Sequence, residues 1–272
     1  MESSFAQDAE GISSALHSGR VEQAALLQLL LKKKIIQPEE FLAEVAELAS
    51  DDYVFSVRRY VAESEWQLRN GRWHVGGSAA TANLGRALLL EADDVALDIG
   101  CGIGGPARQL AEMFGSKIVG VDIRFERVIE AILRTSAMGL SSRVTFQPAE
   151  GEHLPFEDEA FDVVISQATL NHIPDKAGVI RETYRVLRPS GRFGFECEAE
   201  TEKGAANEEG SGEADGLFRI LAWQQLLGAT GFGEIGIEEM WEESRQYYPS
   251  GAEREEIERG ERVAVRIIAR KP

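Results

Sequence analysis

The chain has 272 residues, with 29 Lys and Arg against 46 Asp and Glu, and a formal net charge of −17. This excess of carboxylates disfavours binding to nucleic acid, because contacts with phosphates need lysine and arginine. Hydrophobic residues make up 43% of the chain, which is enough for a sizeable core and excludes general disorder.

Cysteine content and the apolar runs favour a cytoplasmic protein. Cys101 and Cys197 are the only cysteines and offer no disulfide framework. The first residues are acidic and do not resemble a basic leader. The most apolar run, Leu26–Leu31, is far shorter than the ~18 residues of a membrane span, so no membrane association is expected. The four histidines are scattered singly, and no metal site is expected.

Residues 1–72 are expected to form a helical extension. Apolar spacing and helix-end signals predict helices over Val21–Lys34, Pro38–Ala49 and Val54–Arg69. Packing on the main domain is the favoured role. Formation of a homodimer through these helices, or closure as a lid, are the alternatives.

From Ser78 onward the pattern changes to strands that alternate with helices, which indicates a parallel sheet covered on both faces. We expect strands over Val95–Gly100, Lys117–Ile123, Val144–Gln147, Phe161–Gln167, Gly191–Cys197, Ile235–Met240 and Val263–Arg270. We expect helices over Ala79–Leu90, Pro106–Phe114, Glu126–Met138, Asp175–Leu187 and Leu217–Thr230. The last two strands have no strand between them, so they are expected to pair as an antiparallel edge.

The back part of the chain is strongly acidic. Glu196–Arg262 contains 18 acids and 6 bases. Its first part, Glu196–Gly216, is rich in glycine and poor in large apolar side chains, so it is expected to be a loop. Such a loop is either a solvated excursion or a lid that orders over a substrate, since loops after strand carboxyl ends border the site in α/β sheets.

The segment Val95–Phe114 carries the most specific pattern. A strand that contains Asp98 is followed by a glycine-rich turn, and Pro106 takes the first position of the next helix. Glycine lets a ligand approach the backbone, and the helix N-terminus offers unpaired N–H donors. The turn also satisfies G-x-G-x-x-G, so by itself it fits a dinucleotide pyrophosphate.

Two carboxylates favour a different ligand. Asp98 stands two residues before the first glycine, where it would crowd a pyrophosphate but can engage an ammonium group. Asp122 ends the second strand, about twenty residues past the turn, where an acid accepts both hydroxyls of an unphosphorylated ribose. The ligand is therefore expected to have a ribose and a cationic end.

Four segments resemble the motif series of class I S-adenosylmethionine-dependent methyltransferases: LDIGCGIGGPARQLA, VGVDI, AEGEHLPFEDEAFDVVIS and NHIPDKAGVIRETYRVLRPSGRFGF. Within that superfamily they look most similar to small-molecule enzymes of the ubiquinone, tocopherol, phosphoethanolamine and sarcosine/dimethylglycine type. The resemblance implies a Rossmann-like α/β domain over residues 73–272, with a seven-stranded, mostly parallel sheet and an antiparallel edge strand. It also implies S-adenosyl-L-methionine as cofactor.

By position, the resemblance assigns the following residues to the cofactor: Asp98, Gly100, Gly102, Gly104, Asp122, Ile123, Glu150, Gly151, Gln167, Trp73 and His74. The glycines would surround the methionine part, Asp98 its amino group, and Gln167 would face the methionine end. Asp122 would hold the ribose and Ile123 would pack on adenine. Glu150 and Gly151 take their places by spacing to LPF, although the family usually has the shorter Asp at the first of them.

The segment WHVGG, which holds Trp73 and His74, matches a family segment that closes over the cofactor, and a Trp beside two glycines is also an ordinary packing anchor. Methyl transfer from a sulfonium needs mainly alignment, so a general base is optional. His172 is the candidate base by position, and a helix cap is its alternative role. Glu196 is expected at the end of the fifth strand, either facing the cleft or as part of an acidic face.

The sequence thus predicts transfer of a methyl group from S-adenosyl-L-methionine to a small-molecule acceptor. The acidic back half slightly favours an amine. A quinone, phenol or prenyl-type acceptor, and a protein that binds the cofactor without turnover, are the alternatives. An NAD-dependent oxidoreductase would share the early strands but not the ordered LPF and NHIPD segments.

Overall fold

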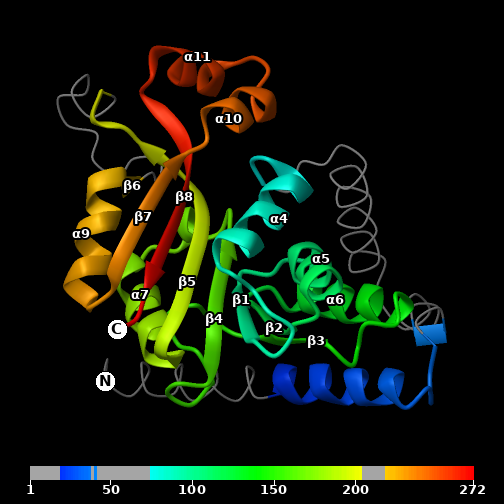
Figure 1. The fold of residues 1–272 in the computed structure, drawn as a ribbon. Helices are drawn as coiled ribbons and strands as arrows, with labels where there is room; N and C mark the ends of the chain where they lie inside the picture. The colour runs from blue at the N-terminus through cyan, green and yellow to red at the C-terminus, as the bar shows by residue number, and fades with distance from the viewer. Residues whose placement is uncertain (1–18, 38–39, 42–73, 204–217) are drawn as a thin grey trace, which may run out of the picture.

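The computed structural model describes residues 19–37, 40–41, 74–203 and 218–272, which form an α/β fold around one sheet (Figure 1). Its strands are β1 (Val95–Ile99), β2 (Lys117–Asp122), β3 (Val144–Pro148), β4 (Phe161–Gln167), β5 (Leu187–Glu200), β6 (Phe218–Arg219), β7 (Gly233–Glu239) and β8 (Arg262–Arg270). Within the described residues the order is β3-β2-β1-β4-β5-β8-β7, with the short β6 beside β5. Strands β1 to β5 are parallel, and β8 lies antiparallel between β5 and β7. The expected sheet is confirmed.

Helices cover both faces of the sheet. One face carries α4 (Gly77–Ala87), α5 (Gly105–Phe114) and α6 (Phe125–Ala137), and the other carries α7 (Lys176–Val186) and α9 (Ile220–Thr230) (Figure 1). Successive residues of β4 alternate between the two layers: Val164 packs in the α7 and α9 layer, whereas Val163 and Ile165 pack in the other. Burial on both sides explains why such strands are apolar throughout.

The order of the strands reverses between β1 and β4. In open α/β sheets the ligand crevice lies outside the carboxyl ends of the strands at this switch point. Here the loops after the two strands touch, because the Thr169 hydroxyl donates a hydrogen bond of 3.2 Å to the Gly100 carbonyl. A ligand site is therefore expected where these loops meet.

Residues 19–32 are helical and pack against the edge of the sheet. The Gln28 side-chain amide donates to the Phe146 carbonyl at 2.7 Å and accepts from the Phe146 N–H at 3.0 Å, so it pairs with β3 as another strand would. Ala24, Leu27 and Leu31 of this helix are buried. This part of the extension covers an otherwise open edge. The other two predicted helices lie outside the described residues, apart from residues 40–41.

The expectation that a loop begins at Glu196 was wrong. β5 continues to Glu200, because acids at the end of β5 have arginine partners. Glu198 pairs with Arg262 at 2.8 Å and Glu200 pairs with Arg219 at 3.2 Å. Cross-strand pairing of opposite charges offsets the unfavourable strand composition. Residues 204–217 lie outside the described part, so the lid hypothesis stays a prediction.

Two short helices, α10 (Trp241–Tyr247) and α11 (Ala252–Arg259), stand between β7 and β8, where the sequence predicts no particular element. They lie near the N-terminal end of α4 (Figure 1). Met240, just before α10, packs with Val75 and Ala80. The segment of α10 and α11 therefore borders the segment that carries His74. Among the described residues, no helix combines the length and apolarity needed to cross a membrane.

Candidate functional site

The turn between β1 and α5 holds three glycines with positive φ, and they differ in what surrounds them. A Cβ on Gly100 would lie 2.2 Å from the Thr169 side chain, and one on Gly104 would lie 2.5 Å from the Phe146 ring. A Cβ on Gly102, with φ +55, would meet nothing within 4 Å. Gly100 and Gly104 thus allow the turn to pack, whereas Gly102 leaves backbone open to a ligand.

Arg108 of α5 supports this turn from inside, and sequence reasoning missed it. Its Nη1 donates to the Ile103 carbonyl at 2.8 Å and lies 3.2 Å from the Thr135 hydroxyl. Burial, and to a lesser degree the charge of Arg134, lowers the pKa of Arg108 to about 10, so the guanidinium is still charged at neutral pH. A lone Arg inside an amphipathic helix gives no sequence signal for such a contact.

Asp98 is the most unusual group of the site. Its side chain is buried, and Oδ2 has no hydrogen-bond partner among the described residues. Burial, and then repulsion by Asp122, raises the pKa of Asp98 to about 7. A buried carboxylate is costly without a partner, and a ligand cation beside it would restore the charged form.

Asp122, at the end of β2, joins the two neighbouring turns. Its Oδ1 accepts from the Arg124 N–H at 2.9 Å, and its Oδ2 accepts from the Gly102 N–H at 3.0 Å. Arg127 Nη1 lies 3.7 Å from Oδ2. The carboxylate is thereby fixed in one orientation at the edge of the sheet.

Asp122 also lines a cavity of about 410 Å³. Six residues singled out from the sequence line this cavity: Gly100, Asp122, Ile123, Glu150, Gly151 and His172. Ile123 is exposed although it is a large apolar residue. A cavity with one exposed apolar wall and a fixed carboxylate suits a flat ring attached to a sugar.

Glu150 and Gly151 differ in freedom. The Glu150 side chain is about half exposed, and its Oε2 lies 3.3 Å from Nδ1 of the exposed His153. Gly151 is buried, and a Cβ there would lie 3.1 Å from Ile173 and from Val179. Close packing therefore favours a small residue here, as the motif also does.

His74 and Gln167 lie outside this cavity and form a second, buried group with Thr81. The Thr81 hydroxyl is 3.0 Å from His74 Nε2 and donates to Gln167 Oε1 at 3.0 Å. Burial lowers the pKa of His74 to about 4, so its ring is neutral at neutral pH. Thr81 was missed, because a Thr inside a predicted helix carries no motif. Trp73 lies outside the described residues.

Comparison with known proteins identifies the domain. Residues 97–195 match the family model of a methyltransferase domain. The chain is also 33% identical to 27-O-demethylrifamycin SV methyltransferase from Amycolatopsis mediterranei, over 64% of this chain and 66% of that protein. This chain carries a class I S-adenosylmethionine-dependent methyltransferase domain. The chain spans roughly half the length of the curated relatives that it matches: 42%, 66% and 54% in three of them.

Solved structures resemble the methyltransferase domain as well. A phosphoethanolamine N-methyltransferase 2 from Haemonchus contortus, in complex with S-adenosyl-L-methionine, superposes with a TM-score of 0.62 at 24% identity, over 76% of this chain and 56% of that chain. The [4+2]-cyclase SpnF superposes with a TM-score of 0.60 at 25% identity, over 72% of this chain and 80% of that chain. The fold predicted from the motif resemblance is confirmed.

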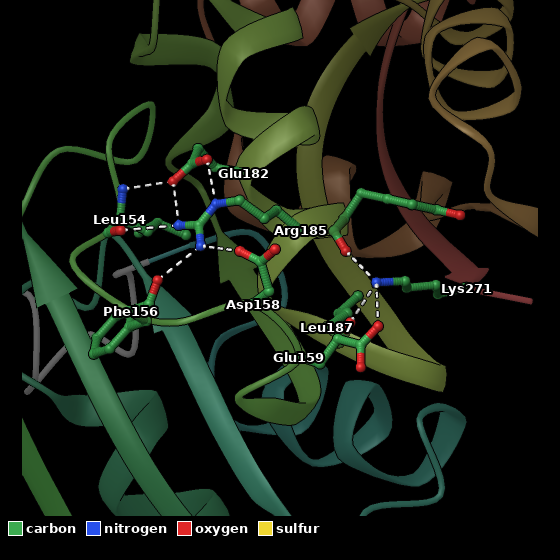
Figure 2. Close-up of polar contacts among 9 residues, drawn as sticks. Leu154, Phe156, Asp158, Glu159, Glu182, Arg185, Leu187 and Lys271 are labelled. Atoms are coloured by element: carbon green, nitrogen blue, oxygen red, sulfur yellow. Dashed lines mark hydrogen bonds and ion pairs between the residues drawn. The ribbon is translucent and has the colours of Figure 1, made fainter.

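Within the methyltransferase domain, Arg185 of α7 holds the loop of the LPF motif, residues 154–156 (Figure 2). Its guanidinium donates to the carbonyls of Leu154 and Phe156, at 3.0 and 2.7 Å, and to Asp158 at 2.8 Å. Two further bonds of 2.7 Å reach Glu182, which accepts from the Leu154 N–H at 2.9 Å. All five guanidinium donors are used. The two motif segments are therefore joined by a structural contact.

Lys271, in the C-terminal tail of the chain, contacts the same C-terminal end of α7 that carries Arg185 (Figure 2). Its Nζ donates to the carbonyls of Tyr184 and Leu187, at 2.9 and 2.7 Å. The Glu159 carboxylate lies 3.9 Å away. A cation beside the last carbonyls of a helix satisfies groups that have no partner within the helix.

The expected position of Glu196 was wrong. It lies inside β5, is buried, and its Oε1 accepts from Arg266 Nε at 2.7 Å. Its other oxygen accepts from Gln167 Nε2 at 2.6 Å. Both oxygens are engaged, so Glu196 is neither an exposed acidic face nor a free carboxylate for a cationic acceptor.

Proposed function

We propose that this chain transfers a methyl group from S-adenosyl-L-methionine to a small-molecule acceptor. The observation that carries the proposal is the buried Asp98 carboxylate with an oxygen that has no partner among the described residues. Close by in sequence, Gly102 leaves backbone open to a ligand. A ligand with an ammonium group supplies the missing partner.

The residues present fit the two halves of this cofactor. Asp98, with Gly102, would hold the amino-acid end. Asp122 would accept the ribose hydroxyls, and Ile123 would pack against adenine in the cavity. The separate positions of Asp98 and the cavity match a ligand with one cationic and one aromatic end.

The cofactor, when bound, supplies an activated methyl group for an in-line displacement. The task of the chain is then to orient and to exclude water, which accounts for several kcal/mol without a catalytic side chain. Fixed groups serve this purpose: Asp122 is held by two backbone N–H groups, and Gln167 is held on both sides of its amide.

His172 remains the predicted catalytic residue, with a specific alternative. Its exposed side chain lines the same cavity as Ile123 and Glu150, the residues assigned to adenine. Gln167 and Asp98, assigned to the methionine end, do not line that cavity. This placement supports contact between His172 and the cofactor more than proton removal from an acceptor.

For the acceptor we propose an amine first. The net charge of −17 attracts a cationic acceptor during encounter. A quinone, phenol or prenyl-type acceptor is the alternative. Relatives are named for phosphoethanolamine, tocopherol and sterols, so their names span nitrogen, oxygen and carbon as the methylated atom and do not choose among them.

A second candidate function is binding of the cofactor without methyl transfer. It is favoured by the likeness to SpnF, which is named as a cyclase at 25% identity and a TM-score of 0.60. Fold and cofactor site are then retained while the chemistry differs. Release of S-adenosylhomocysteine separates the two functions.

The experiment is a screen for acceptor-dependent formation of S-adenosylhomocysteine, with amines first, then phenols, quinones and prenyl compounds. The proposal expects product with at least one acceptor, and at least a tenfold lower rate for Asp122→Asn. Asp93→Asn is the matched control, because Asp93 is an exposed acid just before β1, at the far end of this strand from Asp98. Binding of the cofactor without product from any acceptor supports the second candidate.

Location and partners are proposals of the same kind. We propose a cytoplasmic protein, which the two buried free thiols, Cys101 and Cys197, support. The acidic charge supports the absence of a nucleic-acid partner. A homodimer through the N-terminal helices stays a prediction, tested by light scattering.

A further inference from the structure

A row of polar side chains crosses four strands beside the predicted methionine end. Gln167 of β4, Glu196 of β5, Arg266 of β8 and Glu238 of β7 are direct neighbours in the strand register. We call them the cross-strand row. The first three are buried, and Glu238 is 63% exposed, so the row runs from the site to the surface.

Hydrogen bonds join the cross-strand row without a break. Gln167 Nε2 donates to Glu196 Oε2 at 2.6 Å, and Arg266 donates to Glu196 Oε1 at 2.7 Å. Arg266 Nη1 donates to Glu238 Oε2 at 2.7 Å. Burial raises the pKa of Glu196, whereas Arg266 and Gln167 lower it. Because both oxygens of Glu196 face N–H donors, its carboxylate acts as an acceptor on both sides.

This polarity fixes the Gln167 amide. Nε2 must face Glu196, so Oε1 must face Thr81, and the single Thr81 proton goes to Gln167. The Thr81 oxygen is then left to accept from the ring of His74, whose Nε2 lies 3.0 Å away. The ring of His74 also has a backbone hydrogen bond with Gly77. Through Gln167 and Thr81, the ion pair thus favours the ring that carries its proton on Nε2.

Stability alone does not explain such a pair. Both partners are about 5% exposed, and two charges removed from water gain little over apolar residues of the same volume. The neighbouring pair Glu198–Arg262 joins the same two strands, with side chains 22% and 16% exposed, and does not contact Gln167. The sheet therefore offers a matched pair that lacks the contact with the site.

We propose that Glu196 and Arg266 are positioning residues that fix the Gln167 amide and, through Thr81, hold His74 with its proton on Nε2 at the methionine end of the cofactor. Neither residue touches the reacting atoms; each acts through Gln167. The part that concerns the cofactor rests on the proposed function, whereas the effect on His74 does not.

The first test reads the His74 proton by ¹⁵N NMR of histidine-labelled protein, with the signal assigned through His74→Gln. The wild type is expected to show the Nε2-protonated ring. Glu196→Gln has an amide oxygen for Arg266 and an NH₂ group toward Gln167, which turns the Gln167 amide around. Thr81 then donates to His74 Nε2, so the ring proton is expected on Nδ1. Glu198→Gln is the control and should leave the His74 signal unchanged.

The second test measures binding of S-adenosylhomocysteine by calorimetry. Glu196→Gln is expected to raise Kd at least tenfold, whereas Glu198→Gln is expected to raise it less than twofold. The two variants are matched, because each one removes the carboxylate on β5 that pairs with an arginine on β8. The double variant Glu196→Leu with Arg266→Met removes both charges, guards against failure to fold, and is expected to raise Kd by a similar factor with little change in Tm.

The outcomes are distinct. A His74 signal that stays the same in Glu196→Gln and in the double variant overturns the inference, whatever binds. A shifted signal with unchanged Kd overturns the role toward the cofactor. A wild type that binds no adenosyl ligand, yet shows the tautomer change, overturns the proposed function and upholds the control of His74.

Discussion

Asp98, near the end of β1, and Asp122, at the end of the adjacent β2, form a pair of like charges in a buried site. Burial chiefly, and the charge of Asp122 second, raises the pKa of Asp98 to about 7. Without a cation, the folded protein holds a proton on Asp98 that the unfolded chain releases. A bound ammonium group reverses this preference.

Asp98→Asn should make the free protein more stable at pH 8. The pKa of Asp98 is about 7 in the folded protein, above its ordinary value of 3.8. The folded state of the wild type therefore has its full stability below pH 3.8 and loses stability as the pH rises toward 7, because the carboxyl must then ionise inside the protein. Asn mimics the protonated form and escapes this loss, so its advantage over wild type should grow from near zero at pH 4 to as much as ~4 kcal/mol at pH 8. Urea unfolding at pH 4 and pH 8 measures the difference in the free energy of unfolding between the two proteins. An equal difference at both pH values would contradict the raised pKa of Asp98.

Gly102→Ala and Gly104→Ala should separate binding from folding. At Gly104 the new Cβ meets the Phe146 ring and a φ of +77, so the free energy of unfolding should fall by ~2 to 4 kcal/mol. At Gly102 only the backbone strain applies, and it should cost about 1 kcal/mol of stability. The new methyl group enters the open space beside the turn, so the affinity for S-adenosylhomocysteine should fall at least tenfold. Calorimetry and urea unfolding check both, and equal losses of stability would refute the distinction.

His172→Gln should act on cofactor binding. Since His172 lines the cavity with Ile123 and Glu150, its loss should raise KM for S-adenosylmethionine three- to tenfold and leave kcat within about threefold. If His172 were a general base, its removal would instead lower kcat by about a hundredfold or more. Steady-state kinetics with a productive acceptor decide, and a large fall in kcat at unchanged KM would restore the catalytic role.

Arg185→Ala should destabilise the domain without a direct effect on ligand affinity. The change removes five hydrogen bonds that hold Leu154, Phe156, Asp158 and Glu182, for an expected ~2 to 4 kcal/mol. Arg188→Ala is the control: Arg188 is half-exposed and pairs with Asp162, so its loss should cost under about 1 kcal/mol. Thermal unfolding measures both, and similar values for the two would argue against an anchoring role.

The sequence predicts what depends on neighbours along the chain. Continuous apolar runs indicated the buried parallel strands, and a carboxylate at the end of each of two such strands indicated Asp98 and Asp122. The partners of Glu196 were not predictable, because Arg266 is 70 positions away and their pairing depends on the register of β5 and β8. For the same reason the acids after Cys197 were misjudged as a loop. Thr81 and Arg108 carry no local signal for the groups that they contact.

Calorimetric titration of the whole chain with S-adenosylhomocysteine tests the central claim most directly, with NAD as the control ligand. We expect micromolar binding of S-adenosylhomocysteine and none of NAD. Affinity should rise several-fold from pH 6 to pH 8, because binding requires ionised Asp98, whose pKa is about 7 in the free protein. Asp98→Asn should bind S-adenosylhomocysteine at least tenfold more weakly, and its affinity should no longer depend on pH. Asp93→Asn should keep both the affinity and the pH dependence of the wild type. Binding of NAD instead, or an affinity that is independent of both pH and Asp98, would contradict the account.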